Sequence, residues 1–238
     1  MVHPFVRKLR HGANLDPEDE QLLISLAQPV RSIGAREDIL TDGSQIRSLP
    51  LIVEGWACRY KLLTNGKRQI TALLVPGDLC EPFGMLRRGG TYSIGALTPI
   101  VLAPVSLDAI RGAARANPRI EAALWWDMLA GSALEREHVV SLGRRSASER
   151  TGHLFCELHL RLSMVGLADD TGYTLPVTQA DLGDLLGLSA VHVNRSLQEL
   201  RRTGLISLRE RRLTIRSLAD LQEFSLFDTA YLYAAGSA

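Results

Sequence analysis

The sequence predicts an α+β protein with a β-rich N-terminal half and a mainly helical C-terminal half. Between residues 30 and 107, short apolar runs are separated by Gly, Pro, Asn and Asp, which is typical of a β-barrel or jelly roll. From about residue 107 apolar residues recur at helical spacing, and residues 177–215 combine two short helices with a strand pair. A chain of 238 residues is long enough for two modest domains.

Composition narrows the class of protein further. Hydrophobic residues make up 46% of the chain and charged residues 22%, as in ordinary globular proteins. Apolar runs stay below the ~20 residues of a membrane helix, and the N-terminus lacks a signal-peptide core, so we expect a cytoplasmic protein without membrane contact. Cys58, Cys80 and Cys156 are far apart, which predicts buried or half-buried free thiols rather than disulfides or a metal site.

The N-terminal half is expected to begin with a helix over residues 15–28. Asp16 is a candidate cap, and Pro17 occupies the first helical position. Asn65 and Gly66 form the strongest hairpin signal among the strands that follow. The strands that we expect cover residues 39–40, 51–53, 57–63, 68–75, 92–97 and 100–105.

A long helix is predicted from Asn117 and Pro118 to about Leu142. Its apolar residues lie on more than one side, which fits a helix covered by its own N-terminal domain and by a second copy of the chain. An ordinary buried helix of a monomer fits the pattern equally well. Residues 143–146 predict a hinge, and a second helix is expected over residues 147–165.

Residues 177–206 carry the pattern of a helix-turn-helix. Thr178 with Asp181 resembles a capping box, Gly187 suits the positive φ of a tight helix exit, and Ser189 can cap the next helix. Such a pair of helices places its second helix in the major groove of DNA. The residues expected to face the core are Leu182, Leu185, Leu186, Val193, Leu197 and Leu200.

Residues 207–215 predict a β-hairpin wing with a basic tip. From Ser189 to Arg216 the chain holds seven arginines and two glutamates, a local charge of +5 in a chain with a total of +1. A basic face on a helix-turn-helix is typical of DNA binding, and Arg195 is placed to contact a guanine edge. A winged helix that binds protein is the alternative. The predicted DNA contacts are Thr178, Gln179, Ser189, Ala190, Val191, His192, Asn194, Arg195, Gln198, Arg201, Arg209, Arg211 and Arg212.

These segments resemble the Crp/Fnr superfamily of transcription regulators. The likeness lies in residues 177–189, in residues 193–206 and in the turn Pro76-Gly77-Asp78-Leu79. It implies a double-stranded β-helix (jelly-roll) sensor domain in residues 1–116, a dimerisation helix and hinge in 117–145, and a winged helix-turn-helix in 146–238. It further implies a homodimer on an inverted repeat of double-stranded DNA, controlled by an unknown signal, with RNA polymerase as a further partner.

The resemblance places the candidate effector pocket at Gly77, Asp78, Leu79, Glu81, Pro82, Tyr92 and Ser93. Where relatives that bind cyclic AMP carry Gly-Glu and Arg-Ser, this chain reads Glu81-Pro82 and Tyr92-Ser93. The phosphate arginine is absent and no other cation is obviously placed to replace it, which argues against cyclic AMP. An iron–sulfur cluster would need a cysteine cluster that the N-terminal region lacks.

An enzyme on a jelly roll is the main alternative class. It would need His and carboxylate ligands on inward strand positions. None of the six histidines lies between residues 30 and 110, and no phosphate loop or serine elbow stands out. We therefore predict a regulator without catalytic residues or a metal site.

Overall fold

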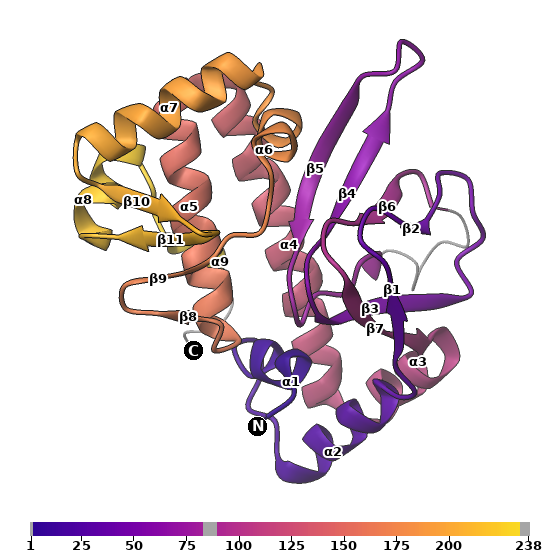
Figure 1. The fold of residues 1–238 in the computed structure, drawn as a ribbon. Helices are drawn as coiled ribbons and strands as arrows, with labels where there is room; N and C mark the ends of the chain where they lie inside the picture. Colours follow the sequence, from indigo (N-terminus) through magenta and orange to yellow (C-terminus); the bar gives the residue numbers. More distant parts are fainter. Residues whose placement is uncertain (1, 83–89, 234–238) are drawn as a thin grey trace.

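The computed structural model describes residues 2–82 and 90–233. Figure 1 shows a β-rich unit and a helical unit on either side of helix α4 (Pro118–Arg144), with α1 (Pro4–Leu9) and α2 (Pro17–Leu26) below them. No helix in the described part of the chain is long and apolar enough to cross a bilayer.

The β-rich unit is a roll of two antiparallel sheets, as the strand pattern predicts. One sheet has the order β1-β7-β3 and the other β2-β6-β4-β5. Ile39, Ile52, Ile94 and Leu102 are buried together in one apolar cluster of this roll. The short strand β1 is absent from the sequence prediction. The bounds are β1 Arg31–Ile33, β2 Asp38–Leu40, β3 Ser48–Glu54, β4 Ala57–Leu62, β5 Arg68–Leu74, β6 Ser93–Ala96 and β7 Ile100–Ser106.

Helices cover the outer end of the roll. The capping box of α2 joins Asp16 and Asp19, in agreement with the predicted helix start. Helix α1 was not predicted; it has six residues, and the side chain of His3 caps it. Helix α3 (Leu107–Ala116) follows β7 directly and ends where Asn117 caps α4.

Helix α4 separates the two units and has two different sides. Ile120 and Trp126 are buried against the rest of the chain, whereas Trp125, Leu129 and Val139 are exposed. The predicted hinge over residues 143–146 is too long, because residues 143 and 144 continue the helical hydrogen bonding of α4. Only Arg145 and Ser146 separate α4 from α5 (Ala147–Met164).

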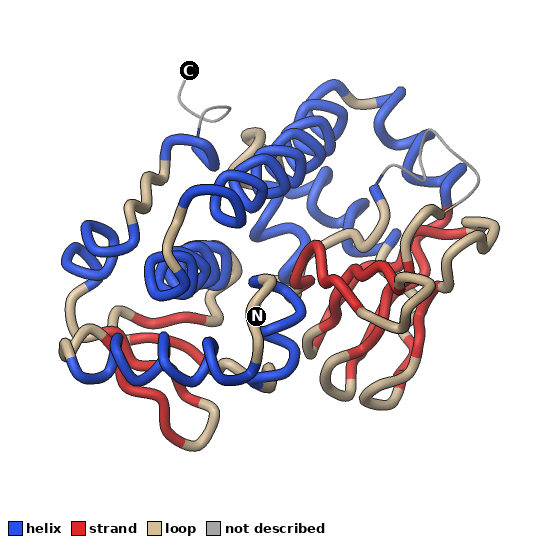
Figure 2. The backbone as a smooth tube through the Cα atoms, turned by 90° about the horizontal axis from the view of Figure 1, so that it is seen from above, coloured by secondary structure: helices blue, strands red, loops and turns tan. Residues whose placement is uncertain are grey.

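The C-terminal unit packs around α5, which Figure 2 shows nearly end-on among the surrounding elements. Its sheet has the order β10-β11-β9-β8. The side chains of Phe155 and Tyr173 are fully buried in its core. All three cysteines are buried free thiols, as the sequence predicts. The remaining bounds are β8 Ala168–Asp169, β9 Gly172–Thr174, α6 Gln179–Leu186, α7 Ala190–Arg202, β10 Ile206–Arg209, β11 Arg212–Ile215, α8 Leu218–Ser225 and α9 Ala230–Tyr233.

Candidate functional site

Helix α6 forms as its local sequence predicts. The Thr178 hydroxyl accepts a hydrogen bond from the Asp181 amide at 3.1 Å, and the Asp181 carboxylate accepts one from the Thr178 amide at 3.1 Å. This reciprocal box satisfies amides that have no partner within the helix. At the other end Gly187 has φ +63°, a conformation that costs a residue with a Cβ more than it costs glycine. The box and the glycine set the length of α6 and the direction in which the chain leaves it.

Helix α7 starts three residues after Gly187 and presents two distinct faces. Ser189 caps it, and Val193, Leu197 and Leu200 are buried against the core. Ser196 is also buried, although apolar residues are expected on that face, and its hydroxyl donates to the His192 carbonyl at 3.0 Å. That bond satisfies the hydroxyl inside the helix, so the apolar packing of α7 is kept.

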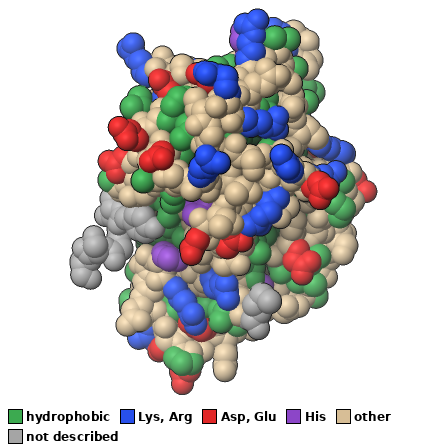
Figure 3. All heavy atoms as spheres, turned by 60° about the vertical axis from the view of Figure 1, so that its left-hand side comes forward, with side chains coloured by type: hydrophobic (Ala, Val, Ile, Leu, Met, Phe, Trp, Pro, Cys, Tyr) green, Lys and Arg blue, Asp and Glu red, His purple; other side chains and the backbone are tan. Residues whose placement is uncertain are grey.

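The opposite face of α7 is open to solvent. All thirteen predicted DNA contacts are exposed, on the N-terminal turn of α6, on α7 and on the strand pair β10–β11. Val191, at the start of α7, is 62% exposed although it is apolar. In Figure 3 several Lys and Arg side chains lie on the upper half of the face, at the height of α7 in Figure 1. The site is therefore an exposed surface that combines polar, apolar and basic side chains.

The wing is a tight hairpin whose tip carries basic side chains. Arg209 pairs with Arg212 across the two strands, and the two turn residues, Glu210 and Arg211, both have positive φ. The Arg212 guanidinium contacts the Asp169 carboxylate at 2.6 Å, which ties the wing to the β8–β9 hairpin. Arg212 is thus partly engaged within the protein, whereas Arg211 projects at the tip.

The predicted effector residues are divided between two cavities. Glu81 and Tyr92 line a cavity of about 580 Å³ between the roll and α4. Asp78, Leu79 and Pro82 line a smaller one of about 100 Å³ that reaches α5 and α6. The other two predicted residues are engaged elsewhere: a Cβ on Gly77 would lie 3.0 Å from the Pro4 carbonyl, and the Ser93 hydroxyl accepts from the Asp42 amide at 3.1 Å.

Asp78, in the turn after β5, forms ion pairs within the protein. Its carboxylate lies 2.7 Å from both Lys8 of α1 and Arg161 of α5. Burial would raise the pKa of this carboxyl, but the two cations hold it below its ordinary value. The ionised carboxylate therefore joins the N-terminal helix to the roll and to the C-terminal unit.

Arg59 is a cation that the sequence reasoning missed. It lies on β4, is 8% exposed and lines both cavities. Its guanidinium contacts Glu135 of α4 at 2.6 Å and the Cys80 carbonyl at 2.9 Å, while its buried Nε has no hydrogen-bond partner. Glu81 also lines the larger cavity, and burial raises the pKa of its carboxyl. Arg59 lies in a strand in which apolar and polar residues alternate, and this pattern is the sequence feature that could have identified it as a residue of the roll interior.

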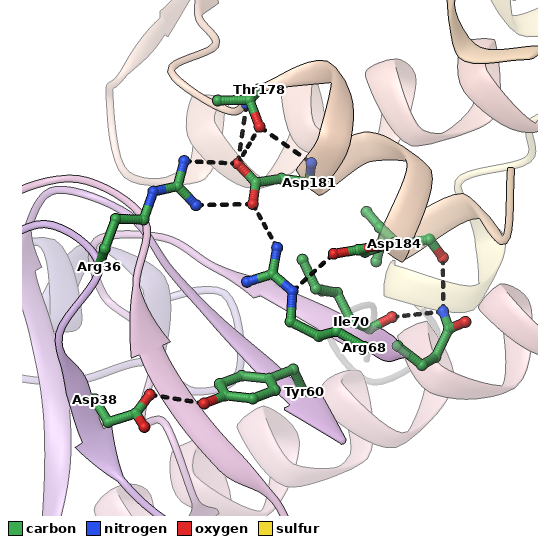
Figure 4. A network of polar contacts seen from close by, with 10 residues as sticks. Arg36, Asp38, Tyr60, Arg68, Ile70, Thr178, Asp181 and Asp184 are labelled. Carbon is green, nitrogen blue, oxygen red and sulfur yellow. Dashed lines mark hydrogen bonds and ion pairs between the residues drawn. The ribbon is translucent and has the colours of Figure 1, made fainter. Parts of the chain in front are cut away.

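A second feature that the sequence did not predict joins the roll to α6. Figure 4 shows Arg36 and Arg68 pointing from the roll toward Asp181 and Asp184. Gln69 of β5 donates to the Leu185 carbonyl at 3.1 Å. These contacts link positions more than a hundred residues apart in the chain, so no local pattern identifies them.

Clusters of three or more His, Cys, Asp or Glu side chains suited to a metal ion are absent within residues 2–82 and 90–233. The geometry instead combines an exposed helix-turn-helix with a wing and a separate roll that contains cavities. The first can contact a duplex through base edges and phosphates. The second can hold a small molecule.

Comparisons with known proteins agree with a chain that combines a roll and a separate helix-turn-helix. The cyclic nucleotide-binding domain family matches residues 30–117, and the Crp-like helix-turn-helix domain family matches residues 149–224. The nitrogen fixation regulation protein FixK of Azorhizobium caulinodans is 31% identical over 206 residues, which cover 85% of this chain and 81% of that protein. The transcriptional activator protein FnrL of Cereibacter sphaeroides is 26% identical and covers 87% and 85% of the two chains.

Among solved structures, FixK2 from Bradyrhizobium japonicum is similar to this chain with a TM-score of 0.73 and 26% identity. The match covers 82% of this chain and 96% of that one. This chain therefore shares its overall fold with a protein of known structure.

Proposed function

The chain belongs to the Crp/Fnr family of DNA-binding transcription regulators, and we propose that it acts as a homodimer on an inverted repeat. In this proposal, residues 1–116 receive a signal, residues 117–145 form the dimerisation helix and hinge, and residues 146–238 bind the operator. The single observation that carries the proposal is the exposed face of α7, beside a basic wing, on a fully packed helix-turn-helix core.

The exposed side chains suit a duplex in three different ways. Arg195 and Asn194 can hydrogen-bond base edges in the major groove, where a bidentate arginine selects guanine. Arg211 at the wing tip can neutralise phosphates without reading sequence. Val191 offers an apolar contact of the kind that a thymine methyl makes.

Helix α4 supports the homodimer. Trp125, Leu129 and Val139 are 51%, 55% and 68% exposed, and their spacing places them along one stripe of the helix. Exposed apolar side chains aligned on a long helix are the pattern that two helices bury against each other. Pairing along α4 would set the two recognition helices about one DNA turn apart, ~34 Å.

The cavity of about 580 Å³ supports the signal site, because it lies between the roll and α4. Among the residues that the structure describes, one cation, Arg59, and two carboxylates, Glu81 and Glu135, line it. Arg59 is already paired with Glu135, so the cavity offers little attraction to a cyclic phosphate. We propose an effector other than cyclic AMP.

Binding-site selection from random duplex DNA, at two salt concentrations, tests the function. We expect enrichment of an inverted repeat and an affinity that falls steeply with salt, because bound phosphates release counterions. Enrichment of single half-sites would contradict the dimer. Absence of any enriched sequence would contradict sequence-specific recognition.

Sedimentation of Leu129→Lys tests the dimer separately. A charge in the α4 stripe should dissociate the dimer, because an unpaired buried ammonium is costly. Leu62→Lys is the matched control, because Leu62 is 60% exposed at the end of β4 and away from the stripe. Equal sedimentation of wild-type protein and Leu129→Lys would contradict an interface on this face.

A further inference from the structure

A cluster of four charged side chains fixes α6 against the roll, and we call it the α6 clamp: Arg36, Arg68, Asp181 and Asp184. The Arg36 guanidinium donates two hydrogen bonds to the Asp181 carboxylate, at 2.8 and 3.0 Å. Arg68 of β5 donates to Asp181 at 2.8 Å and to Asp184 at 2.7 Å. As Figure 4 shows, both arginines approach α6 from the roll, so the clamp crosses between the two units.

Burial makes this clamp stronger than a surface ion pair. The Asp181 side chain is only 1% exposed, whereas Arg36 and Arg68 are 47% and 28% exposed. Burial would raise the pKa of Asp181, but hydrogen bonds, first that from Arg36, hold it well below its ordinary value. A buried carboxylate that loses its partners is strongly unfavourable, so the clamp resists opening.

The clamp leaves the proposed DNA face open. Thr178 and Gln179, at the start of α6, remain exposed, and so does the outer face of α7. Two guanidinium groups offset the charge of two carboxylates on a helix whose N-terminal end must meet phosphates. Without the arginines, α6 would present two negative charges near DNA, which would repel the duplex.

The clamp also restrains the orientation of α6 and α7 relative to the roll. The C-terminal unit is connected to α4 through Arg145 and Ser146, which are its only covalent link to the rest of the chain. Arg161 of α5 is also tied to the roll through Asp78, and the clamp adds an attachment on α6, away from both, that restrains rotation of α6 and α7. A dimer that contacts two half-sites at once needs this orientation to be set before binding.

We propose that Arg36 and Arg68 are positioning residues for DNA binding: from the roll, they hold α6 in the orientation in which α7 meets the major groove. This inference rests on the proposed function. According to this inference, the roll affects DNA affinity by orienting α6, without touching DNA itself.

The test compares Arg68→Glu with Lys67→Glu in the full-length protein. Lys67 is exposed in the same hairpin and takes no part in the clamp, so both variants change the total charge equally. Dissociation constants are measured on the selected operator at fixed salt. Hydrogen exchange of α6 amides is measured without DNA. We expect Arg68→Glu to weaken operator binding on the order of tenfold, the cost of about one charge-assisted hydrogen bond, and to speed exchange in α6.

The charge-swapped double variant, Arg68→Glu with Asp184→Arg, restores one ion pair of the clamp but leaves the new carboxylate beside Asp181, so it should recover only part of the affinity and of the protection. A role in folding stability alone would leave the dissociation constant unchanged once it is expressed per folded protein. Arg36→Gln is the milder second variant if Arg68→Glu does not fold; it should change both measurements in the same direction.

Unchanged or tighter operator binding by Arg68→Glu would overturn the proposal, and so would an equal loss in Lys67→Glu. If the wild-type protein selects no operator, the proposed function fails. The exchange measurement still decides whether the clamp holds α6, because it uses no DNA.

Discussion

We expect the burial of His153 to make the stability of the C-terminal unit sensitive to acid. The imidazole lies on α5 at 3% exposure, with ring centroids of Phe227 and Tyr231 at 5.0 and 6.2 Å. Burial, with smaller effects of the Arg145 and His138 charges, lowers its pKa to about 3. Glu137 lies 3.4 Å away but is already paired with Arg145 at 2.7 Å, so it does little to favour the protonated ring.

The size of the effect follows from the two pKa values. Above pH 6.5, the ordinary pKa of the imidazole, folded and unfolded chains both hold the neutral ring, and its contribution to stability is complete. As the pH falls from 6.5 toward 3, only the unfolded chain takes up the proton, so the free energy of unfolding decreases by about 1.4 kcal/mol per pH unit. At pH 5 this loss is about 2 kcal/mol.

Urea unfolding of wild-type protein and His153→Phe, at pH 7 and pH 5 and equal protein concentration, measures this loss. Phenylalanine fits an aromatic environment and does not titrate, so the variant should lose about 2 kcal/mol less than wild type between the two pH values. Equal losses in the two proteins would refute the reasoning, because the acid sensitivity would then come from other groups.

Two further pairs of variants test the helix-turn-helix. Arg195→Ala should cost about 1–3 kcal/mol of operator affinity and relax base preference at one position, whereas Arg211→Ala should weaken binding without altering the preferred sequence. Binding-site selection with each variant measures both effects, and an unchanged preference in Arg195→Ala would remove it as a base contact. Gly187→Ala should lower the free energy of unfolding by about 1 kcal/mol because of its φ of +63°. Gly143→Ala, in the last turn of α4 with open space around it, should raise the free energy of unfolding by about 0.4–1 kcal/mol. Thermal denaturation of the two proteins should therefore give shifts of opposite sign.

The parts of the fold that the sequence predicts are those specified by local chemistry. Thr178, Gly187 and Ser189 define the helix-turn-helix within twelve residues, because caps and a positive φ are properties of neighbouring atoms. Strands β2 to β7 are predicted because turn residues separate them. Helix α1 escapes prediction because six residues carry too little periodicity.

The parts that the sequence does not predict depend on distant residues. Arg212 has the appearance of a free wing cation, yet its partner, Asp169, lies 43 residues away. Arg36 and Asp181 are 145 residues apart, and nothing near either residue indicates the other. The hinge was predicted too long because Gly143 weakens a helix in isolation, whereas in the fold the residues on both sides of it continue α4.

Strand β5 contributes residues both to the larger cavity and to the contacts with α6. Gln69 and Thr71 line the larger cavity, while Arg68 and Gln69 bond to α6. If the α6 clamp orients α7 as proposed, a molecule that binds the cavity and favours one position of β5 would change the affinity for operator by some factor. Thermodynamic reciprocity then requires the operator to change the affinity for that molecule by the same factor. Operator DNA is thus itself a reagent for finding the effector: a compound that binds the protein–DNA complex and the free protein differently is the one that transmits a signal.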